Sequence, residues 1–130
     1  MLVVDASVAF SASRVEQGFS LLAEDELVAP ALMWSEARSA LHQVAWRGEL
    51  STADALAAFT RLESAPVVMT SPGELGEESW RLADELGWAK TYDAEYLALA
   101  RILGCRVVTL DHRLRRGADR LGLVVAPNEL

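Results

Sequence analysis

The chain has 130 residues, a length that suits one domain, and its 52% hydrophobic content can build a single core of ordinary size. Twelve Lys and Arg residues against 19 Asp and Glu residues give a formal net charge of −7. This charge excludes recognition of nucleic acid through the overall field, so any such contact must use a local basic patch. We expect one domain over residues 1–130.

The N-terminal segment and the cysteine content predict the cellular compartment. No basic segment precedes the first apolar run, and Asp5 interrupts that run, which argues against a signal peptide. No stretch approaches the ~18 continuous apolar residues of a membrane helix. The single cysteine, Cys105, cannot form an internal disulfide and is interpreted as a reduced core residue. We therefore expect a cytoplasmic protein without a membrane segment.

The first apolar run, at residues 2–4, lacks polar alternation, which is typical of a parallel strand covered by helices on both faces. It stops at Asp5, and Ser7 follows. In open parallel sheets, chemistry takes place just beyond the carboxyl ends of the strands, where these two side chains are expected. Taken alone, Asp5 is equally well explained as the N-cap of the next helix.

Apolar runs and helical periods alternate along the rest of the chain. Gly and Pro stand at most of the expected boundaries. This alternation predicts a three-layer α/β/α sandwich with a central parallel sheet of about five strands. The expected elements are two short helices within 7–24, a strand at 27–29, a helix from 31 to about 47, a helix from 51, a strand at 66–69, helices at 74–86 and 91–103, a strand at 106–110, a short basic helix at 114–121 and an edge strand at 122–125.

Four acidic residues are expected to meet at one edge of this sheet: Asp5, Glu36, Asp93 and Asp111. Asp5 and Asp111 end the first and fourth strands, and Asp93 begins the helix before the fourth strand. Glu36 lies on the apolar stripe of the helix after the second strand, so helical spacing points it toward the core side. Each aspartate alone could be an N-cap, and Glu36 could be a rim residue paired with Arg38 or His42. The coincidence of all four is the informative feature.

Gathered carboxylates repel one another, so without a counter-charge one or more of them must take up a proton. A divalent cation removes this conflict, and oxygen ligands favour Mg²⁺ or Mn²⁺ over Zn²⁺. Such ions can activate water for phosphodiester cleavage. Ser7 and Thr109 could orient a metal-bound water or a ligand, or they could simply form capping and turn bonds.

Four segments of the chain resemble the acidic motifs of the PIN domain. They are VVDASV, WSEARSAL, TYDAEYLALA and VVTLDHRL, and their order and spacing are more narrowly similar to the VapC toxins of VapBC toxin–antitoxin modules. The resemblance covers essentially the whole chain and implies one PIN domain over residues 1–130. It implies a homodimeric endoribonuclease that depends on Mg²⁺ or Mn²⁺ and is inhibited by a VapB-like antitoxin. It assigns metal binding and catalysis to Asp5, Glu36, Asp93 and Asp111, with Ser7 and Thr109 as supporting hydroxyls.

The segment after the last motif departs from the family pattern. Relatives often carry a further acid or Asn there, whereas this chain has His-Arg-Leu-Arg-Arg, with Asp119 as the nearest acid. A second metal would therefore be held weakly until RNA supplies a phosphate ligand. His112 could contact the substrate or be an ordinary surface histidine.

Arginines are concentrated directly after Asp111. The four arginines of this segment are predicted to hold RNA phosphates beside the metals: Arg113, Arg115, Arg116 and Arg120. The alternative is a solvated basic face on a short helix, which is how most charge runs are used.

Two other functions compete with this hypothesis. A phosphoacceptor receiver module is also a parallel α/β fold with an acidic Mg²⁺ pocket. It needs paired acids after the first strand and an acceptor Asp after the third, whereas here the third strand is followed by Thr70 and Ser71. A catalytically inert PIN binding module is disfavoured because all four acids are present.

The N-terminal helices carry aromatic residues that could anchor an amphipathic partner segment: Phe10, Phe19, Trp34 and Trp46. They could equally be core or homodimer contacts. A basic side chain of such a partner is predicted to reach the four acids, since a cluster of carboxylates attracts Arg or Lys.

Overall fold

The computed structural model of the protein describes residues 1–22 and 26–130. The end of the predicted helical range 7–24 therefore lies outside the described residues. In the described part the strands form one parallel sheet in the order β3-β2-β1-β4-β5. The strands are β1 (Leu2–Val4), β2 (Leu27–Ala29), β3 (Val68–Met69), β4 (Arg106–Val108) and β5 (Val124–Val125). The predicted sheet, with its last strand at an edge, is confirmed.

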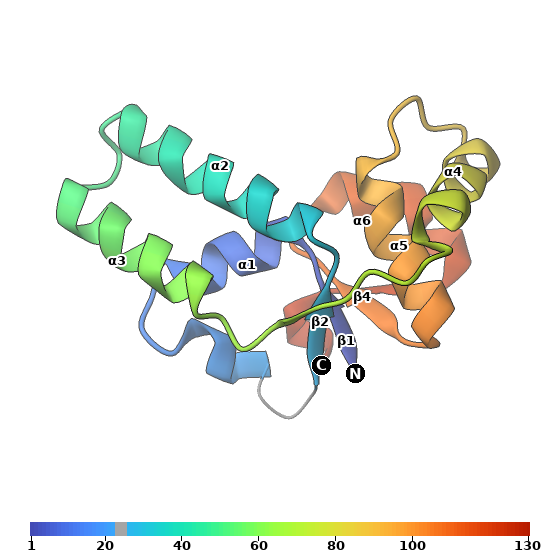
Figure 1. Ribbon diagram of the computed structural model, residues 1–130, viewed down its shortest axis with the longest axis horizontal. Coiled ribbons are helices and arrows are strands. Elements are labelled where there is room, and N and C mark those ends of the chain that lie inside the picture. The colour runs from blue at the N-terminus through green and yellow to red at the C-terminus, as the bar shows by residue number, and fades with distance from the viewer. Residues whose placement is uncertain (23–25) are drawn as a thin grey trace.

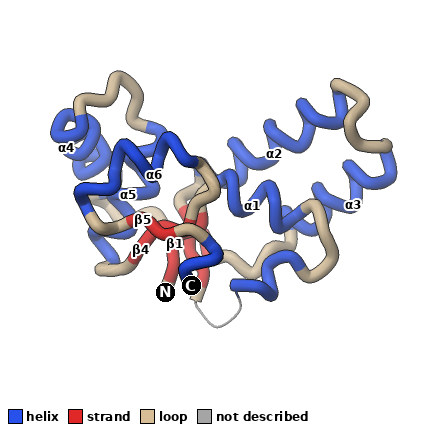
Figure 2. Tube along the Cα trace, turned by 180° about the vertical axis from the view of Figure 1, so that it is seen from behind, coloured by secondary structure: helices blue, strands red, loops and turns tan. Residues whose placement is uncertain are grey.

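Helices cover both faces of the sheet, which completes the predicted three layers. Figure 1 places α1, α2 and α3 on one side and α4, α5 and α6 on the other, with the strands between them. Figure 2 shows the same two groups from behind. The helices are α1 (Ala6–Ser13), α2 (Leu32–Trp46), α3 (Thr52–Glu63), α4 (Leu75–Leu86), α5 (Tyr92–Leu103) and α6 (His112–Ala118), with 3₁₀ turns at Gly18–Leu22, Asp119–Leu121 and Pro127–Glu129.

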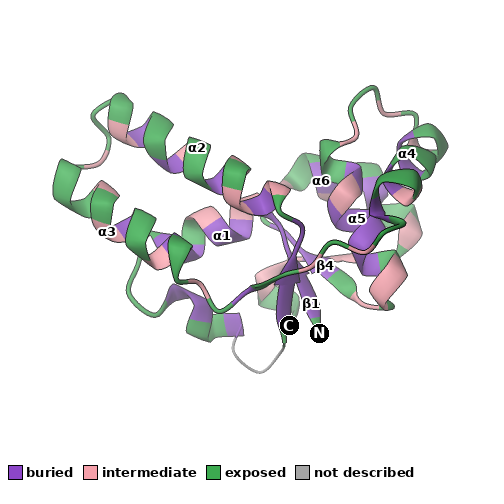
Figure 3. Cartoon of the chain, in the orientation of Figure 1, coloured by how far each residue is buried: buried purple, intermediate pink, exposed green. Residues whose placement is uncertain are grey.

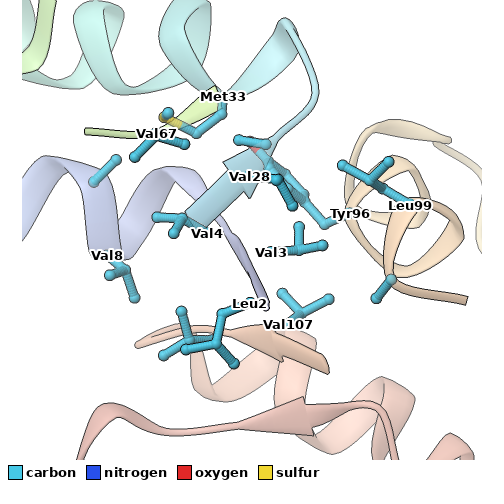
Figure 4. Close-up of a cluster of buried hydrophobic side chains, with 14 of the residues drawn as sticks. Leu2, Val3, Val4, Val8, Val28, Met33, Val67, Tyr96, Leu99 and Val107 are labelled. Carbon is cyan, nitrogen blue, oxygen red and sulfur yellow. The ribbon is translucent and has the colours of Figure 1, made fainter. Parts of the chain in front are cut away.

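The core is centred on β1, which pairs with β2 on one side and β4 on the other. Val3 lies opposite Val28 and Val107, and all three side chains are buried. Figure 4 shows these valines close to Tyr96 and Leu99, both of which come from α5. Full burial of each such aliphatic side chain contributes about 1.5–3 kcal/mol. Figure 3 shows the same inside-outside division along the helices, whose outer faces are exposed.

Two of the predicted acids follow strands and cap the next helix. Asp5 accepts a hydrogen bond from the amide of Val8 at 3.1 Å and so caps α1. Asp111 accepts from the amide of Arg113 at 2.9 Å and caps α6. Each carboxylate therefore satisfies an amide that the first helical turn leaves without a partner. The N-cap explanation of both residues is correct, and it fixes the side chains at the carboxyl edge of the sheet.

The fourth strand ends at Val108 instead of continuing to Leu110. The amide of Leu110 donates to Ser7 Oγ at 2.9 Å, and the amide of Asp111 donates to Thr109 Oγ1 at 2.9 Å. These two amides donate to side-chain hydroxyl groups and therefore do not pair with a neighbouring strand. The α6 helix also starts earlier than predicted, because Asp111 caps it and His112 is already helical.

Cys105 is half-buried at the end of α5 that lies away from the acids. Burial raises the pKa of its thiol, which agrees with a structural role. None of the helices in the described part of the chain is both long and apolar enough to span a membrane.

Candidate active site

Asp5 lies at the carboxyl end of the central strand and is only 4% exposed. Its Oδ1 accepts hydrogen bonds from Ser7 Oγ at 2.7 Å and from the amide of Val8, and its Oδ2 accepts one from Thr109 Oγ1. Burial raises the pKa of Asp5, and the nearby charge of Asp111 acts in the same direction. The three hydrogen bonds oppose this rise because they stabilise the ionised carboxylate.

Ser7 and Thr109 form the support of this carboxylate. Each hydroxyl accepts a backbone amide from the segment after β4 and donates its proton to Asp5, and the two hydroxyl oxygens lie 3.3 Å apart. A hydroxyl carries a single proton, and in both Ser7 and Thr109 that proton is already donated to Asp5. The arrangement therefore orients Asp5. It leaves neither hydroxyl a proton to donate to a water.

The other three acids line one cavity of about 650 Å³, formed between the two groups of helices. Glu36 comes from α2, Asp93 from the first turn of α5, and Asp111 from the segment between β4 and α6. In Figure 1 the carboxyl ends of the strands point toward this region between the two groups. Asp5 is coupled to the same place through the charge of Asp111. The structure thus brings all four predicted acids to one edge of the sheet.

The carboxylates around the cavity disfavour one another's ionised forms. Partial burial raises the pKa of the Asp93 carboxyl, Asp111 raises it further, and only Arg113 acts against this rise. Burial and the charge of Glu36 also raise the pKa of Glu95. Negative charge is therefore in excess at this edge, as predicted for acids gathered without a cation.

Glu36 is held by a residue that the sequence alone did not identify. The Tyr96 hydroxyl donates a hydrogen bond of 2.5 Å to Glu36 Oε1. Burial raises the pKa of Tyr96 well above its usual value, and Glu36 adds to the rise, so this phenol keeps its proton. The alternative in which Glu36 pairs with Arg38 is not what the structure shows, since Arg38 pairs with Glu63 at 2.8 Å.

The donor set suits a hard divalent cation, because carboxylate oxygens are the ligands that Mg²⁺ and Mn²⁺ prefer. The acids repel one another because their negative charge is not balanced, and such a cation would neutralise it. Within residues 1–22 and 26–130, no three His, Cys, Asp or Glu side chains already stand together as a metal cluster. The acids therefore line the cavity without forming a closed ligand cluster.

The predicted RNA-binding arginines of α6 have different surroundings. Arg113 lines the cavity, with its Nε 3.9 Å from Asp111 Oδ1. Arg115 makes a bidentate ion pair with Glu129, in which Arg115 Nη2 lies 3.0 Å from Glu129 Oε2. Arg116 is exposed. Lys90, which the sequence gave no reason to select, also lines the cavity from the loop between α4 and α5.

Comparison with known proteins agrees with this geometry. Residues 2–120 match the PIN domain family. Over 129 residues the chain is 37% identical to VapC ribonuclease Mb0985 of Mycobacterium bovis and to ribonuclease VapC9 of Mycobacterium tuberculosis. These alignments cover 98% of this chain and 99% of each relative.

Two solved structures share the fold. PAE2754 from Pyrobaculum aerophilum has a TM-score of 0.77 at 24% identity, over 98% of this chain and 91% of that one. VapC20 of Mycobacterium tuberculosis, a toxin that cleaves the sarcin-ricin loop, has a TM-score of 0.61 at 19% identity, over 89% of this chain and 94% of that one. At these identities the two structures bear on the fold alone. Together, the family match and the full-length relatives show that the chain belongs to the PIN domain family, as a nuclease of the VapC toxin type.

Proposed function

We propose that the protein is a Mg²⁺- or Mn²⁺-dependent endoribonuclease, the toxin of a type II toxin–antitoxin pair, with Asp5, Glu36, Asp93 and Asp111 as its metal-binding and catalytic residues. The observation that supports this most strongly is the single cavity lined by Glu36, Asp93 and Asp111, with Asp5 electrostatically coupled to Asp111. The 37% identity to proteins named VapC ribonucleases supports RNA as the substrate.

In this mechanism each part of the chain has a defined task. Glu36 and Asp93, from opposite sides of the sheet, and Asp111, from its carboxyl edge, would hold the cation through their carboxylate oxygens. Asp5 is kept in one orientation by Ser7 and Thr109. When bound, the cation supplies a more acidic water for attack on phosphorus and stabilises the leaving oxygen. The excess negative charge of the cavity would favour the binding of a cation.

The RNA backbone needs positive charge beside these acids, and two side chains of the cavity can provide it. Arg113 and Lys90 line the same space as the carboxylates and would hold the phosphates that flank the scissile bond. Arg116 is exposed on α6 and remains a predicted phosphate contact. Arg115 keeps the same predicted role, although RNA would have to compete with Glu129 for its guanidinium.

The direct test is cleavage of a labelled RNA by purified protein treated with EDTA and then supplied with Mg²⁺, Mn²⁺ or Ca²⁺. We expect no cleavage in EDTA and recovery with Mg²⁺ or Mn²⁺, because Ca²⁺ prefers longer bonds and more ligands. Internal cut sites, read from the RNA ends, would establish an endonuclease. Undiminished cleavage in EDTA would contradict metal dependence, and a lack of cleavage under all conditions would favour the inert binding module.

The proposed antitoxin is a small VapB-like protein with a helix that packs on the N-terminal helices. Of the four aromatics considered for this contact, Phe19 is buried, and Phe10 and Trp34 pack partly against the core. Trp46 is 83% exposed. Trp46 is therefore the aromatic best placed to anchor a partner.

The antitoxin is also proposed to place a basic side chain among the four acids. Co-expression with the neighbouring gene product, intact or truncated after its helix, tests both contacts. We expect the truncated partner to bind but to inhibit less than the intact one. Full inhibition by the truncated form would leave steric blocking as the only mechanism.

The remaining parts of the proposal concern the form in which the enzyme works. We propose one PIN domain over residues 1–130 that acts as a homodimer in the cytoplasm. Light scattering during size-exclusion chromatography measures the mass directly. A monomer at micromolar concentration would contradict the homodimer without affecting the nuclease proposal.

A further inference from the structure

The hydrogen bond between Tyr96 and Glu36 joins helices from opposite sides of the sheet. Tyr96 belongs to α5 and is 1% exposed, while Glu36 belongs to α2 and is 60 positions earlier in the chain. The phenol donates to Glu36 Oε1 at 2.5 Å. A short bond to a carboxylate is among the stronger hydrogen bonds in proteins. The two helix groups are therefore connected through a residue of the proposed metal site.

The same helix also carries a second acid of the site. Asp93 lies three residues before Tyr96, so the two side chains are neighbours along one face of α5. This helix thus supplies one acid directly and controls the position of another through Tyr96. The bond occupies only Oε1, so Oε2 stays available to a ligand. Glu has three rotatable side-chain bonds, and fixing one oxygen removes most of that freedom before a cation arrives.

We propose that Tyr96 is a positioning residue that holds the Glu36 carboxylate ready for the cation and so sets the metal affinity of the cavity. The inference rests on the proposed function, because it assumes that Glu36 is a metal ligand. Partners of this kind, one shell outside the metal, typically change metal affinity or activity by about 10- to 100-fold. Tyr96 itself does not contact the cation.

Tyr96→Phe tests the proposal, since it removes the hydroxyl and keeps the buried ring. Mn²⁺ binding is measured by the electron paramagnetic resonance signal of free Mn²⁺, which does not depend on activity. We expect binding about 10- to 100-fold weaker than in the wild type. Ser79→Ala is the control, because it removes a buried hydroxyl that donates within α4 to the carbonyl oxygen of Leu75, outside the residues that line the cavity. Its Mn²⁺ affinity should equal that of the wild type.

A double-mutant cycle with Glu36→Gln shows whether Tyr96 acts through Glu36. If it does, adding Tyr96→Phe to Glu36→Gln changes Mn²⁺ affinity far less than Tyr96→Phe alone. An equal loss in both backgrounds would mean that the hydroxyl acts through general packing, which would overturn the inference.

The cycle also separates this inference from the proposed function. If Glu36→Gln weakens Mn²⁺ binding and Tyr96→Phe does not, the inference fails and the metal site stands. If the wild type binds no Mn²⁺, both fail.

Discussion

Thr109 donates a hydrogen bond to Asp5 across 104 positions of sequence, and this contact joins the carboxyl ends of the two strands at the middle of the sheet. Both side chains are buried. The same hydroxyl accepts the amide of Asp111, so one oxygen links two acids of the site. A single methyl-for-hydroxyl exchange at this position can therefore be used to test stability and activity together.

Thr109→Val should destabilise the protein by about 2–3 kcal/mol, because it removes a donor from a buried carboxylate and an acceptor from a backbone amide. Urea unfolding followed by circular dichroism measures this change. Thr60→Val is the matched control, since Thr60 is exposed on α3 and bonds only within its helix. We expect the control to stay within about 0.5 kcal/mol of the wild type. An equal loss of unfolding free energy at both positions would show that the hydrogen bond to Asp5 contributes no extra stability.

Replacement of any one acid by its amide should abolish cleavage. The loss of activity should exceed the roughly 100-fold that is typical for residues that only support metal ligands. The fold should persist, because each exchange removes charge without creating a cavity. RNA cleavage in Mg²⁺, with circular dichroism as the check on folding, measures both. A folded variant with wild-type turnover would remove that residue from the mechanism. The four variants are Asp5→Asn, Glu36→Gln, Asp93→Asn and Asp111→Asn.

The stability of the metal-free protein should depend on pH through Asp93. Its pKa in the folded protein is raised above the ordinary value of 3.8, by partial burial and by Asp111. Ionised Asp93 therefore costs stability at a pH above its folded pKa, and this cost disappears as the pH falls toward 3.8. In EDTA, Asp93→Asn should melt at a higher temperature than the wild type near about pH 7, and the difference should shrink toward about pH 4. A difference that stays constant with pH would contradict this assignment.

Arg113→Gln should weaken RNA binding and lower the salt dependence of the binding constant by about one phosphate contact, a slope change of about 0.7–0.9. Fluorescence anisotropy of a labelled RNA at several salt concentrations, with Asp93→Asn as the common background to prevent cleavage, measures it. Arg47→Gln is the control, because Arg47 pairs with Glu49 at the far end of α2. An unchanged slope in Arg113→Gln would favour the solvated basic face.

Gly117→Ala should destabilise the protein although alanine favours helices. A Cβ at Gly117 would lie 2.9 Å from the Trp88 ring, and Trp88 is part of the cavity wall. The matched variant is Gly76→Ala in α4, where nothing lies within 4 Å of the added carbon. That exchange should be neutral or stabilise by up to about 1 kcal/mol. Thermal unfolding compares the two, and stabilisation by both would show that Trp88 moves aside at no cost.

The order of elements and the four acids could be predicted from the sequence, because apolar runs and helix terminators are local signals. Gly87 and Gly104 illustrate this, since their left-handed φ angles of 71° and 67° end α4 and α5 where the pattern stops. Strand lengths were harder to predict. Residues 66–69 were expected to form a strand, and only Val68–Met69 pair with β2.

Contacts between distant side chains could not be predicted in this way. The position of Tyr96 in the helical pattern predicts an ordinary core residue, and Glu36, the partner of its hydroxyl, is 60 residues away. The pairing of Arg115 with Glu129 depends on how the C-terminal 3₁₀ turn packs beside α6. Lys90 reaches the cavity only because its loop folds over that edge. In each case the deciding fact is a tertiary distance, which has no local pattern in the sequence.

The central position of β1 has a consequence for synthesis on the ribosome. β1 is translated first, yet one of its two neighbours in the sheet, β4, is among the last segments to be made. A ribosome that stalls before residue 106 releases a chain whose middle strand lacks a partner on one side and whose cavity lacks Asp111. Folding and the assembly of the acids are therefore completed by the same late segment. Prematurely terminated copies therefore lack both the fourth strand and one of the four acids of the site.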